Sequence, residues 1–427
     1  MKIIASLSRN IITALDVGSS TVTTVVAERR KGEERPRILG IGIAPSFGVR
    51  RGAVVDLEDA ISSIRASVHE ARRSSGYHIK SAWLAVGGSH VSVASSRGVV
   101  AVSRADGEIS HEDVRRAIAA AEAFIPKNAN KEILHMIPRD FKVDHEAGIK
   151  DPVGMHGIRL EADVLIIECS IPFLKNLFKC VEAAGLRIDD YVFGPLAASE
   201  AALTKRQKEL GVFLLDIGGG TASFMVFEEG VPIHAGVIPL GGKHITNDVA
   251  IGFRTHVDSA ENIKVALGSC MPGEISKRDT VRIADFAPAD IPEAVVSDDY
   301  AGVYTRRELA EIIEARLRDI FELVQKELKK INRTQLLPAG LVLTGGSSLV
   351  PGIVEFARRE VKLPVDLGVP YVFEEAIDKK TAPVLVTCLG LLQWADKQQH
   401  EKGLTWLSRF TRKTERMWLR WVKSLLP

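Results

Sequence analysis

The stretch of this sequence best suited to chemistry is an acidic, glycine-rich turn, VFLLDIGGGT, at residues 212–221. Four apolar residues predict a buried strand, and Asp216 stands at its tip before three glycines lead into a second apolar run, residues 222–227. Glycine lets backbone amides approach an anion closely, and an aspartate beside such a turn can hold a hydrated divalent cation. The turn is a candidate phosphate site, although hairpins also use glycine for purely steric reasons.

The N-terminal half contains the same pattern 200 residues earlier, in IITALDVGSST at residues 11–21. Asp16, Gly18 and Thr21 correspond in spacing to Asp216, Gly218 and Thr221. Two copies of Asp-x-Gly-x-x-Thr, each followed by a β-rich segment, favour two similar domains over coincidence. We therefore expect the two domains to face each other across one ligand, a nucleotide phosphate.

A third glycine turn occurs in LVLTGGSSLVPGIVEFARRE, residues 341–360. A buried strand again passes through two glycines, Gly345 and Gly346, into a helix. Free amides at such a helix start suit a ribose or a phosphate. An ordinary strand-to-helix turn is the alternative interpretation if this segment is considered alone.

Composition indicates an ordinary globular protein long enough for two core-bearing domains, with 427 residues, 46% of them hydrophobic and 26% charged. The net charge of +2 argues against a broad nucleic-acid surface, so no nucleic-acid partner is expected. The four widely spaced cysteines predict reduced core thiols. The N-terminus does not resemble a signal peptide, and no apolar stretch reaches the length of a spanning helix. We expect the chain to stay in the cytoplasm.

The C-terminal residues differ in character from the rest of the chain. Residues 402–427 carry a net charge of +6, so the remainder of this +2 chain is −4. If these residues form an α-helix, with about 100° of rotation per residue, their apolar and basic side chains lie on opposite faces. This pattern is typical of an interfacial membrane helix with tryptophan at the lipid headgroups. Packing on the protein body and binding to a partner groove are the alternatives. The residues predicted to bind the membrane are Trp406, Leu407, Phe410, Met417, Trp418, Trp421 and Leu425, with the basic Arg412, Lys413, Arg416 and Arg420.

Local signals predict several elements between these motifs. Apolar spacing predicts a helix over residues 57–74, Ser110 and Thr305 are expected helix N-caps, and Pro172 should start another helix. Residues 81–169 differ in character from their surroundings and are expected to form an inserted subdomain. A β-rich segment is expected at about residues 272–292.

The three turns in this order resemble the superfamily of actin, sugar kinases and heat-shock chaperones, and within it the chain is most similar to the FtsA family of bacterial cell-division proteins. The segments that carry this resemblance are FKVDHEAGIKDPVGMHGIRLEADV (141–164), GPLAASEAAL (194–203) and LGGKHITNDVA (240–250). It implies an α/β, actin-like two-domain ATPase fold with a relocated small subdomain and a C-terminal amphipathic helix. The implied domains are 1–80 with 170–204 (first), 81–169 (inserted small subdomain), 205–240 with 303–395 (second), 241–302 (its small subdomain), 396–403 (a linker) and 404–427 (the membrane-targeting helix).

Carried over residue by residue, the resemblance implies an ATP site with Mg²⁺ held through water by Asp16 and Asp216. Glu261 and Lys264 would line the adenosine pocket, where a plain surface salt bridge is the alternative. Gly345, Gly346 and Ser347 would cover the base and ribose, and Gly242 would border the pocket beside Gly241. The phosphate turns would comprise Asp16, Gly18, Ser19, Ser20 and Thr21, and Asp216, Gly218, Gly219, Gly220 and Thr221.

Two classes of function follow from this resemblance. The first is an adaptor that polymerises on the cytoplasmic side of the inner membrane, binds anionic lipid, tethers FtsZ and recruits later division proteins, with ATP hydrolysis slow or absent. The second is an active ATPase or phosphotransferase, for which no base is evident because Ser223 stands where actin-like ATPases carry a histidine. A pilus-assembly relative is a further alternative, although it would not need the C-terminal tail.

Overall fold

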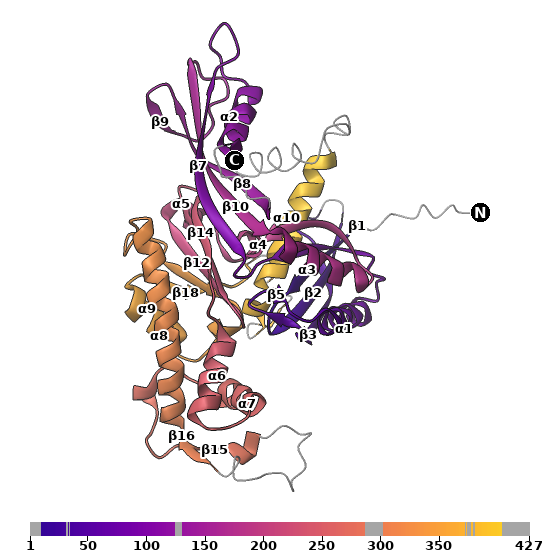
Figure 1. The fold of residues 1–427 in the computed structure, drawn as a ribbon, viewed down its shortest axis with the longest axis vertical. Coiled ribbons are helices and arrows are strands. Elements are labelled where there is room, and N and C mark those ends of the chain that lie inside the picture. The colour runs from indigo at the N-terminus through magenta and orange to yellow at the C-terminus, as the bar shows by residue number, and fades with distance from the viewer. Residues whose placement is uncertain are drawn as a thin grey trace, which may run out of the picture.

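The computed structural model of the chain describes residues 10–30, 33, 35–123, 130–286, 302–371, 373, 377–378 and 381–403. Two five-stranded sheets form the centre of an elongated α/β molecule (Figure 1). A third sheet extends from one end, and a mostly helical region extends from the other. The expected α/β class, with two similar sheet-bearing halves, is confirmed.

The first sheet has the order β11-β6-β1-β2-β3, so that the first strand of the chain is central. β1 pairs antiparallel with β2 and parallel with β6. Side chains alternate along β1, where Leu15 and Val17 join one core layer and Ile12 and Ala14 join the other. The strands are β1 (Asn10–Val17), β2 (Thr21–Arg29), β3 (Arg37–Pro45), β6 (Ser81–Val86) and β11 (Arg187–Phe193), and a short hairpin of β4 (Val49–Arg50) and β5 (Ala53–Val54) follows β3.

Helices α1 (Leu57–Ser75) and α3 (Ile171–Ala183) cover the Leu15 face of this sheet. The predicted helix over residues 57–74 is confirmed, since Asp56 caps its first turn by accepting from Asp59 N at 3.0 Å. It ends at Gly76, whose φ of 65° is left-handed. The helix predicted to start at Pro172 begins one residue earlier, at Ile171.

The second sheet repeats the arrangement of the first, with the order β14-β13-β12-β17-β18. β12 pairs antiparallel with β13 and parallel with β17. Helices α8 (Arg306–Lys330) and α9 (Ile353–Val361) pack on one face. The strands are β12 (Val212–Ile217), β13 (Ala222–Glu228), β14 (Val231–Ile238), β17 (Leu341–Thr344) and β18 (Val365–Leu367).

Two helices, α4 (Gly194–Ala202) and α10 (Ala382–Gly403), join the two halves. One hydrophobic core runs from Ala14 and Val25 of the first sheet through these helices to Leu214 and Met225 of the second. The helices pack closely at Gly390, where a methyl group would collide with the carbonyl oxygen of Ala197. The short α5 (Lys205–Leu210) then leads into the second sheet.

The inserted sheet has the order β7-β10-β8-β9, and α2 (His111–Ala123) packs on it. Ser110 Oγ accepts from Asp113 N at 3.3 Å, as expected of an N-cap. Residues 81–86, grouped above with the inserted subdomain, instead form β6 of the first sheet, because their backbone pairs with β1 and β11. The inserted strands are β7 (Val91–Ala101), β8 (Lys131–Val143), β9 (Glu146–Ile149) and β10 (Arg159–Ser170).

The region at the opposite end contains α6 (Gly242–Gly252), α7 (Val257–Leu267) and a two-stranded pair, β15 (Thr280–Arg282) and β16 (Val303–Thr305). The predicted cap of α8 is confirmed, because Thr305 and Glu308 form a capping box. The expected β-rich segment is not found in its described part, residues 272–286, which holds two 3₁₀ turns and β15. Pro272 and Gly273 favour a turn there.

Residues 396–403, expected as a linker, form the C-terminal turns of α10. The sequence between Gly390 and Gly403 contains neither proline nor glycine and is rich in helix formers. None of the described helices has an apolar stretch long enough to cross a membrane. The predicted membrane-binding residues, 404–427, lie outside the described residues. The four cysteines are free and buried, as expected.

Candidate functional site

The two acidic turns have the same local geometry. Each aspartate is the next-to-last residue of a central strand, β1 or β12. Each turn is closed by one main-chain bond of 3.0 Å, from Gly18 N to Thr21 O in the first and from Gly218 N to Thr221 O in the second. The duplication expected from the sequence spacing is therefore also a duplication in three dimensions.

The turns lie against each other at the junction of the two halves. A methyl group at Gly219 would collide with Ser20 Oγ, and one at Gly220 would lie 2.6 Å from Ser19 Oγ. Only glycine allows this approach, which explains Gly219 and Gly220 in the second turn. The sequence predicted that both turns face one site, and the structure brings them together.

Two further glycine segments converge on the carbonyl oxygen of Gly218. Gly242 N donates to Gly218 O at 2.9 Å, and Ser347 Oγ donates to the same oxygen at 3.4 Å. Gly241 is equally close, because a methyl group there would lie 2.5 Å from Gly218 O. The segments that begin α6 and follow β17 therefore both border the second acidic turn.

The carboxylates of Asp16 and Asp216 lie close enough to influence each other. Burial, followed by the charge of Asp216, raises the pKa of Asp16 to about 7. Burial raises the pKa of Asp216 to about 6, partly opposed by a hydrogen bond from Thr387. A cation beside these groups would stabilise both charged forms.

Helix α10 supplies contacts to this site that sequence reasoning missed. Thr387 Oγ1 donates to Asp216 Oδ2 at 3.2 Å. The next residue, Cys388, is a buried thiol whose Sγ lies 3.4 Å from Thr23 O, and burial and the charge of Asp16 raise its pKa. Neither residue lies in a recognisable motif, so the sequence offers no local signal for them.

Lys243 bridges the two halves and was also missed. Its Nζ donates to the carbonyl oxygen of Ser19 at 2.5 Å, and its own amide donates to Gly219 O at 2.8 Å. Burial lowers its pKa. Its position directly after the Gly241-Gly242 pair is the signal that could have singled it out.

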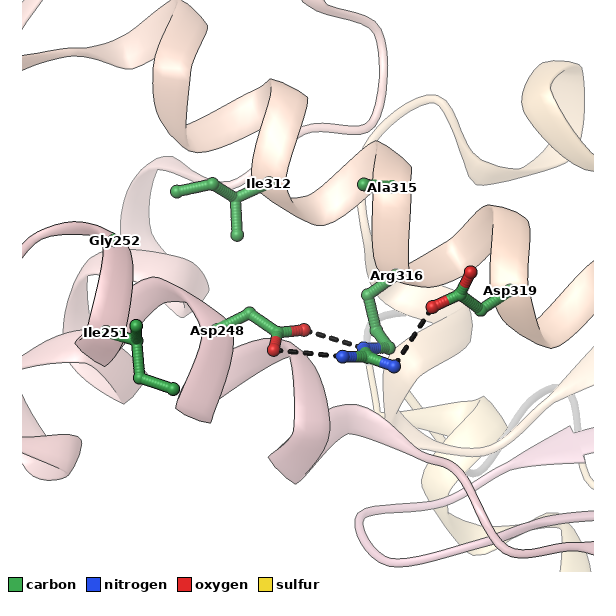
Figure 2. A pocket seen from close by; sticks show the side chains of 7 residues that line it. All are labelled: Asp248, Ile251, Gly252, Ile312, Ala315, Arg316 and Asp319. Carbon is green, nitrogen blue, oxygen red and sulfur yellow. Dashed lines mark hydrogen bonds and ion pairs between the residues drawn. The ribbon is translucent and has the colours of Figure 1, made fainter.

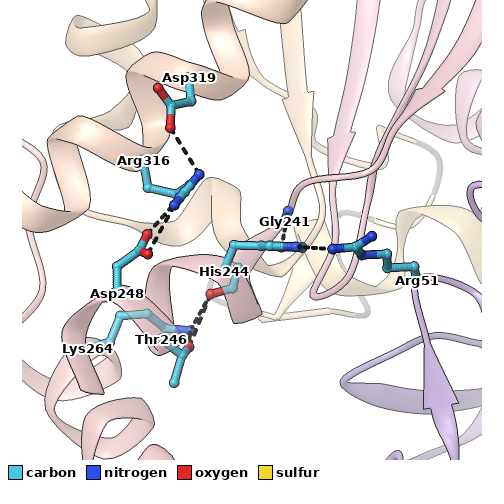
Figure 3. Close-up of polar contacts among 9 residues, drawn as sticks. Arg51, Gly241, His244, Thr246, Asp248, Lys264, Arg316 and Asp319 are labelled. Atoms are coloured by element: carbon cyan, nitrogen blue, oxygen red, sulfur yellow. Dashed lines mark hydrogen bonds and ion pairs between the residues drawn. The ribbon is translucent and has the colours of Figure 1, made fainter. Parts of the chain in front are cut away.

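Glu261 and Lys264 lie on α7, and Figure 3 shows Lys264 beside Thr246 of α6. Lys264 Nζ lies 2.6 Å from Glu261 Oε2 and 2.8 Å from Thr246 Oγ1, and its side chain is only 12% exposed. It also donates to Gly242 O at 3.4 Å. The pair is thus more than a surface salt bridge, because it supports the glycine segment that contacts the second turn.

These residues fit a Mg²⁺-bound nucleotide in chemical terms. In the described part of the chain, the main-chain amides of Ser19, Ser20, Gly219 and Gly220 donate to no protein acceptor, and amides of this kind suit phosphate. No group of three metal-binding side chains occurs among the described residues. Mg²⁺ commonly binds through one or two carboxylates together with water and substrate phosphates, which matches two aspartates beside free amides.

A separate groove lies between α6 and α8 (Figure 2). Arg316 spans it with two bonds to Asp248, of 2.6 and 3.0 Å, and a third to Asp319 at 3.0 Å. Ile251 stands at its rim and is 77% exposed. The groove combines a fixed ion pair with exposed apolar surface.

Comparison with known proteins adds family information to this geometry. The family model described as "Cell division protein FtsA" matches residues 213–390, and "SHS2 domain inserted in FTSA" matches residues 88–168. Cell division protein FtsA of Pseudomonas aeruginosa is 36% identical over 395 residues, covering 92% of this chain and 91% of that protein. The Borreliella burgdorferi protein of the same name is 38% identical, covering 92% of each. The Escherichia coli (strain K12) protein is 31% identical, covering 99% of each.

Solved structures agree on the fold. The PilM-PilN type IV pilus biogenesis complex has a TM-score of 0.64 at 16% identity and covers 90% of this chain and 97% of its own. MreB5 of Spiroplasma citri, solved with ADP and with AMPPNP, has TM-scores of 0.50 and 0.51 at 12% identity and covers 92% of this chain and 98% of its own. The fold is therefore actin-like.

Proposed function

This chain belongs to the FtsA family of cell division proteins, and from that premise we propose that it is an ATP-binding protein that polymerises on the cytoplasmic face of the plasma membrane and anchors FtsZ there. The proposal has five parts: nucleotide binding, membrane binding, FtsZ docking, self-association and recruitment of later division proteins. Relatives at 31–38% identity favour a division role over pilus assembly or phosphoryl transfer.

Nucleotide binding is supported above all by the contact between the two acidic turns. Their carboxylates have raised pKa values, and their amides are free of protein acceptors in the described chain. The MreB structures of the same fold hold ADP and AMPPNP. When bound, Mg²⁺ would neutralise phosphate charge, while Asp16 and Asp216 orient its water ligands. A ligand that contacts both halves favours the closed arrangement, in which the two halves lie against each other.

Calorimetric titration with ATP, in the presence and absence of Mg²⁺, tests this part. We expect Mg²⁺-dependent binding by the parent and a loss of about tenfold or more in Asp16→Ala and Asp216→Ala, because each removes a carboxylate that would hold the water ligands of the cation. Glu58→Ala, on an exposed face of α1, is the control. Equal affinity in the parent and both aspartate variants would contradict the site. ATP turnover is expected to be slow.

Membrane binding is proposed for residues 404–427, which follow α10. The basic side chains Arg412, Lys413, Arg416 and Arg420 would face anionic lipid, each contributing about 1 kcal/mol. Co-sedimentation with anionic vesicles should retain the full chain and lose a chain ending at Lys402. Replacing the four basic residues by glutamine should weaken binding to anionic but not to zwitterionic vesicles. Equal sedimentation of both chains would exclude this anchor.

FtsZ docking is proposed for residues 241–302 and the adjoining α8, where the groove between α6 and α8 is the candidate surface. Ile251 offers an exposed apolar contact there. We expect Ile251→Glu to weaken binding to FtsZ, whereas Leu210→Glu, exposed on α5, should not. Equal binding by both variants would place the docking surface elsewhere.

Self-association and recruitment of later division proteins are proposed for the inserted sheet, which corresponds to the family's inserted domain. Ile158, the residue before β10, is 81% exposed, and Val99 on β7 is 39% exposed. Ile158→Asp is expected to reduce filament formation on lipid monolayers viewed by electron microscopy, because it places a charge in an apolar contact. Unchanged filaments would move the contact to another surface.

A further inference from the structure

Two basic side chains from opposite halves of the molecule meet beside the second acidic turn. Arg51 lies at the tip of the β4–β5 hairpin, and His244 lies in the first turn of α6 (Figure 3). Arg51 Nη2 and His244 Nε2 are 3.4 Å apart. This contact belongs to neither the Mg²⁺ carboxylates nor the adenosine-side residues described above.

The backbone of Arg51 is held in place by the first half of the site. Its φ of 50° is left-handed, which is uncommon for a residue with a side chain. Ser89 N donates to Arg51 O at 3.1 Å, and Gly52 N donates to Ser19 Oγ at 3.0 Å. Ser19 thus connects the hairpin tip to the first phosphate turn, and Arg51 is fixed beside that turn.

The contact between Arg51 and His244 joins two donors. Gly241 N donates to His244 Nδ1 at 3.1 Å, so this nitrogen carries a lone pair. A neutral ring then has its proton on Nε2, and burial followed by the charge of Arg51 lowers the pKa of His244, which favours this neutral form. A guanidinium can only donate. Neither side chain therefore supplies the acceptor that the other needs.

The surrounding charges favour an anion at this point. Lys243 brings a further cation to Ser19 O. The neighbouring acids are already engaged, since Asp248 is paired with Arg316 and Glu261 with Lys264. No carboxylate of the described chain forms an ion pair with Arg51.

The position relative to the glycine turn indicates which anion. A methyl group at Gly220 would lie 3.0 Å from Arg51 Cα, so the hairpin tip borders the turn whose amides suit phosphate. Lys243, the neighbour of His244, donates its amide to Gly219 O. Arg51 and His244 therefore approach the same phosphate turn from the two halves.

We propose that Arg51 and His244 bind the terminal phosphate of ATP from the two halves of the molecule, with Arg51 Nη2 and His244 Nε2 donating to its oxygens. This inference rests on the nucleotide binding proposed above. ADP lacks the group that would accept from both donors. The pair therefore makes the closed arrangement depend on the triphosphate.

Binding of Mg·AMPPNP and Mg·ADP to the full chain tests this assignment. The variants are Arg51→Met and His244→Phe, which keep a long chain and a planar ring, respectively, and remove the donors. Each should weaken AMPPNP binding by about tenfold, as expected for a charge-assisted bond, and change ADP binding by less than about twofold. Arg50→Met is the matched control, because it removes one positive charge from the adjacent residue, and it should keep the parent's preference. Thermal melts establish that each variant is folded, and Arg51→Lys should recover part of the AMPPNP affinity.

Three outcomes would overturn the proposal. Equal losses for AMPPNP and ADP would mean that the pair only holds the two halves together. An unchanged preference in both variants would mean that neither side chain contacts the terminal phosphate. Micromolar binding of inorganic phosphate to the nucleotide-free protein, lost in both variants, would assign the donors to a free anion. A parent chain that binds neither nucleotide would instead remove the proposed function itself, and this inference with it.

Discussion

At the scale of single residues, Gly345 illustrates how tightly the site is packed. Its φ of 83° is left-handed, and a methyl group there would collide with Asp216 Oδ1. A methyl group added to its neighbour Gly346 would have no other atom within 4 Å. A side chain is therefore excluded at Gly345 but has room at Gly346.

The change Gly345→Ala should displace the Asp216 carboxylate and weaken Mg·ATP binding by about tenfold or more, or at least ~1.4 kcal/mol. Gly346→Ala, the matched control, should remain within about twofold of the parent. Calorimetric titration of both variants provides the measurement. Similar affinities in the two variants would show that the Asp216 carboxylate does not contribute to binding.

The two carboxylates should also make stability depend on pH. Their folded-state pKa values, about 7 and about 6, lie above the ordinary 3.8, so ionisation is harder in the folded chain. Without a divalent cation, their contribution to stability is complete below pH 4 and is lost as the pH rises through 6 and 7. Asp16→Asn removes this loss and should raise the melting temperature at pH 8 by roughly 1 °C, corresponding to about 1 kcal/mol after allowing for partial exposure.

The same variant should show little gain at pH 4.5, where the folded carboxyl group is already protonated. Added Mg·ATP should stabilise the parent more than the variant at pH 8. A melting temperature that falls in Asp16→Asn at pH 8 without cation would contradict the raised pKa.

Some residues of the candidate site lie in short sequence motifs, whereas others reach it only through the packing of distant elements. Asp16, Asp216 and the glycines could be predicted because a strand, an acid and a turn are adjacent in sequence. Thr387 could not, because its bond to Asp216 spans 171 residues and depends on how α10 packs. Arg51 and His244 were missed for the same reason, since their meeting requires the two halves to be assembled.

At the scale of elements, the contact between α4 and α10 depends on one glycine. Gly390→Ala adds helix propensity worth about 1 kcal/mol. It also places a methyl group against the Ala197 carbonyl oxygen, and such overpacking costs about 1–3 kcal/mol. We expect net destabilisation, measured by urea unfolding. In the control Gly252→Ala, the methyl group would meet only the flexible end of Ile312 and should change stability little.

Helices whose caps are set by neighbouring residues were predicted correctly. A strand was assigned to the wrong sheet where only its hydrogen-bonded partners determine the sheet. The caps at Ser110 and Thr305 are set by neighbouring residues, and both are present. The sequence of residues 81–86 fits a strand of the first sheet or of the inserted sheet. Only their hydrogen bonds to β1 and β11 assign them to the first sheet. Residues 396–403 were predicted as a linker by resemblance, whereas their composition favours continuation of the helix.

At the scale of the whole molecule, the inserted sheet is tied to the second half as well as to the first. Arg139 on β8 donates to Ile233 O on β14 at 2.9 Å and to Asp163 on β10 at 2.7 Å. Lys150 donates to Glu229 O at 2.7 Å. The inserted sheet is therefore positioned by both halves and should respond to a change in their arrangement.

Replacing Arg139 by methionine should release this contact at a cost of about 1–2 kcal/mol. Hydrogen exchange should then increase in β14 and in β8, with the rest of the second sheet unchanged. Arg97→Met is the control, because Arg97 is 64% exposed and lies 3.8 Å from Glu161, a pair that contributes little. Equal exchange in both variants would mean that the inserted sheet is held by its apolar contacts alone.

Helix α10 has a mechanical consequence. It touches Asp216 through Thr387 and stays helical to Gly403, roughly 24 Å further on at 1.5 Å per residue. α10 is one continuous helix from Ala382 to Gly403, so a displacement of the turn that holds Thr387 is carried along the rest of its length. A tilt of α10 by a few degrees about Thr387 displaces its end at Gly403 by about one or two ångströms. A shift of Asp216 that moves Thr387 would therefore change the direction in which α10 points at Gly403.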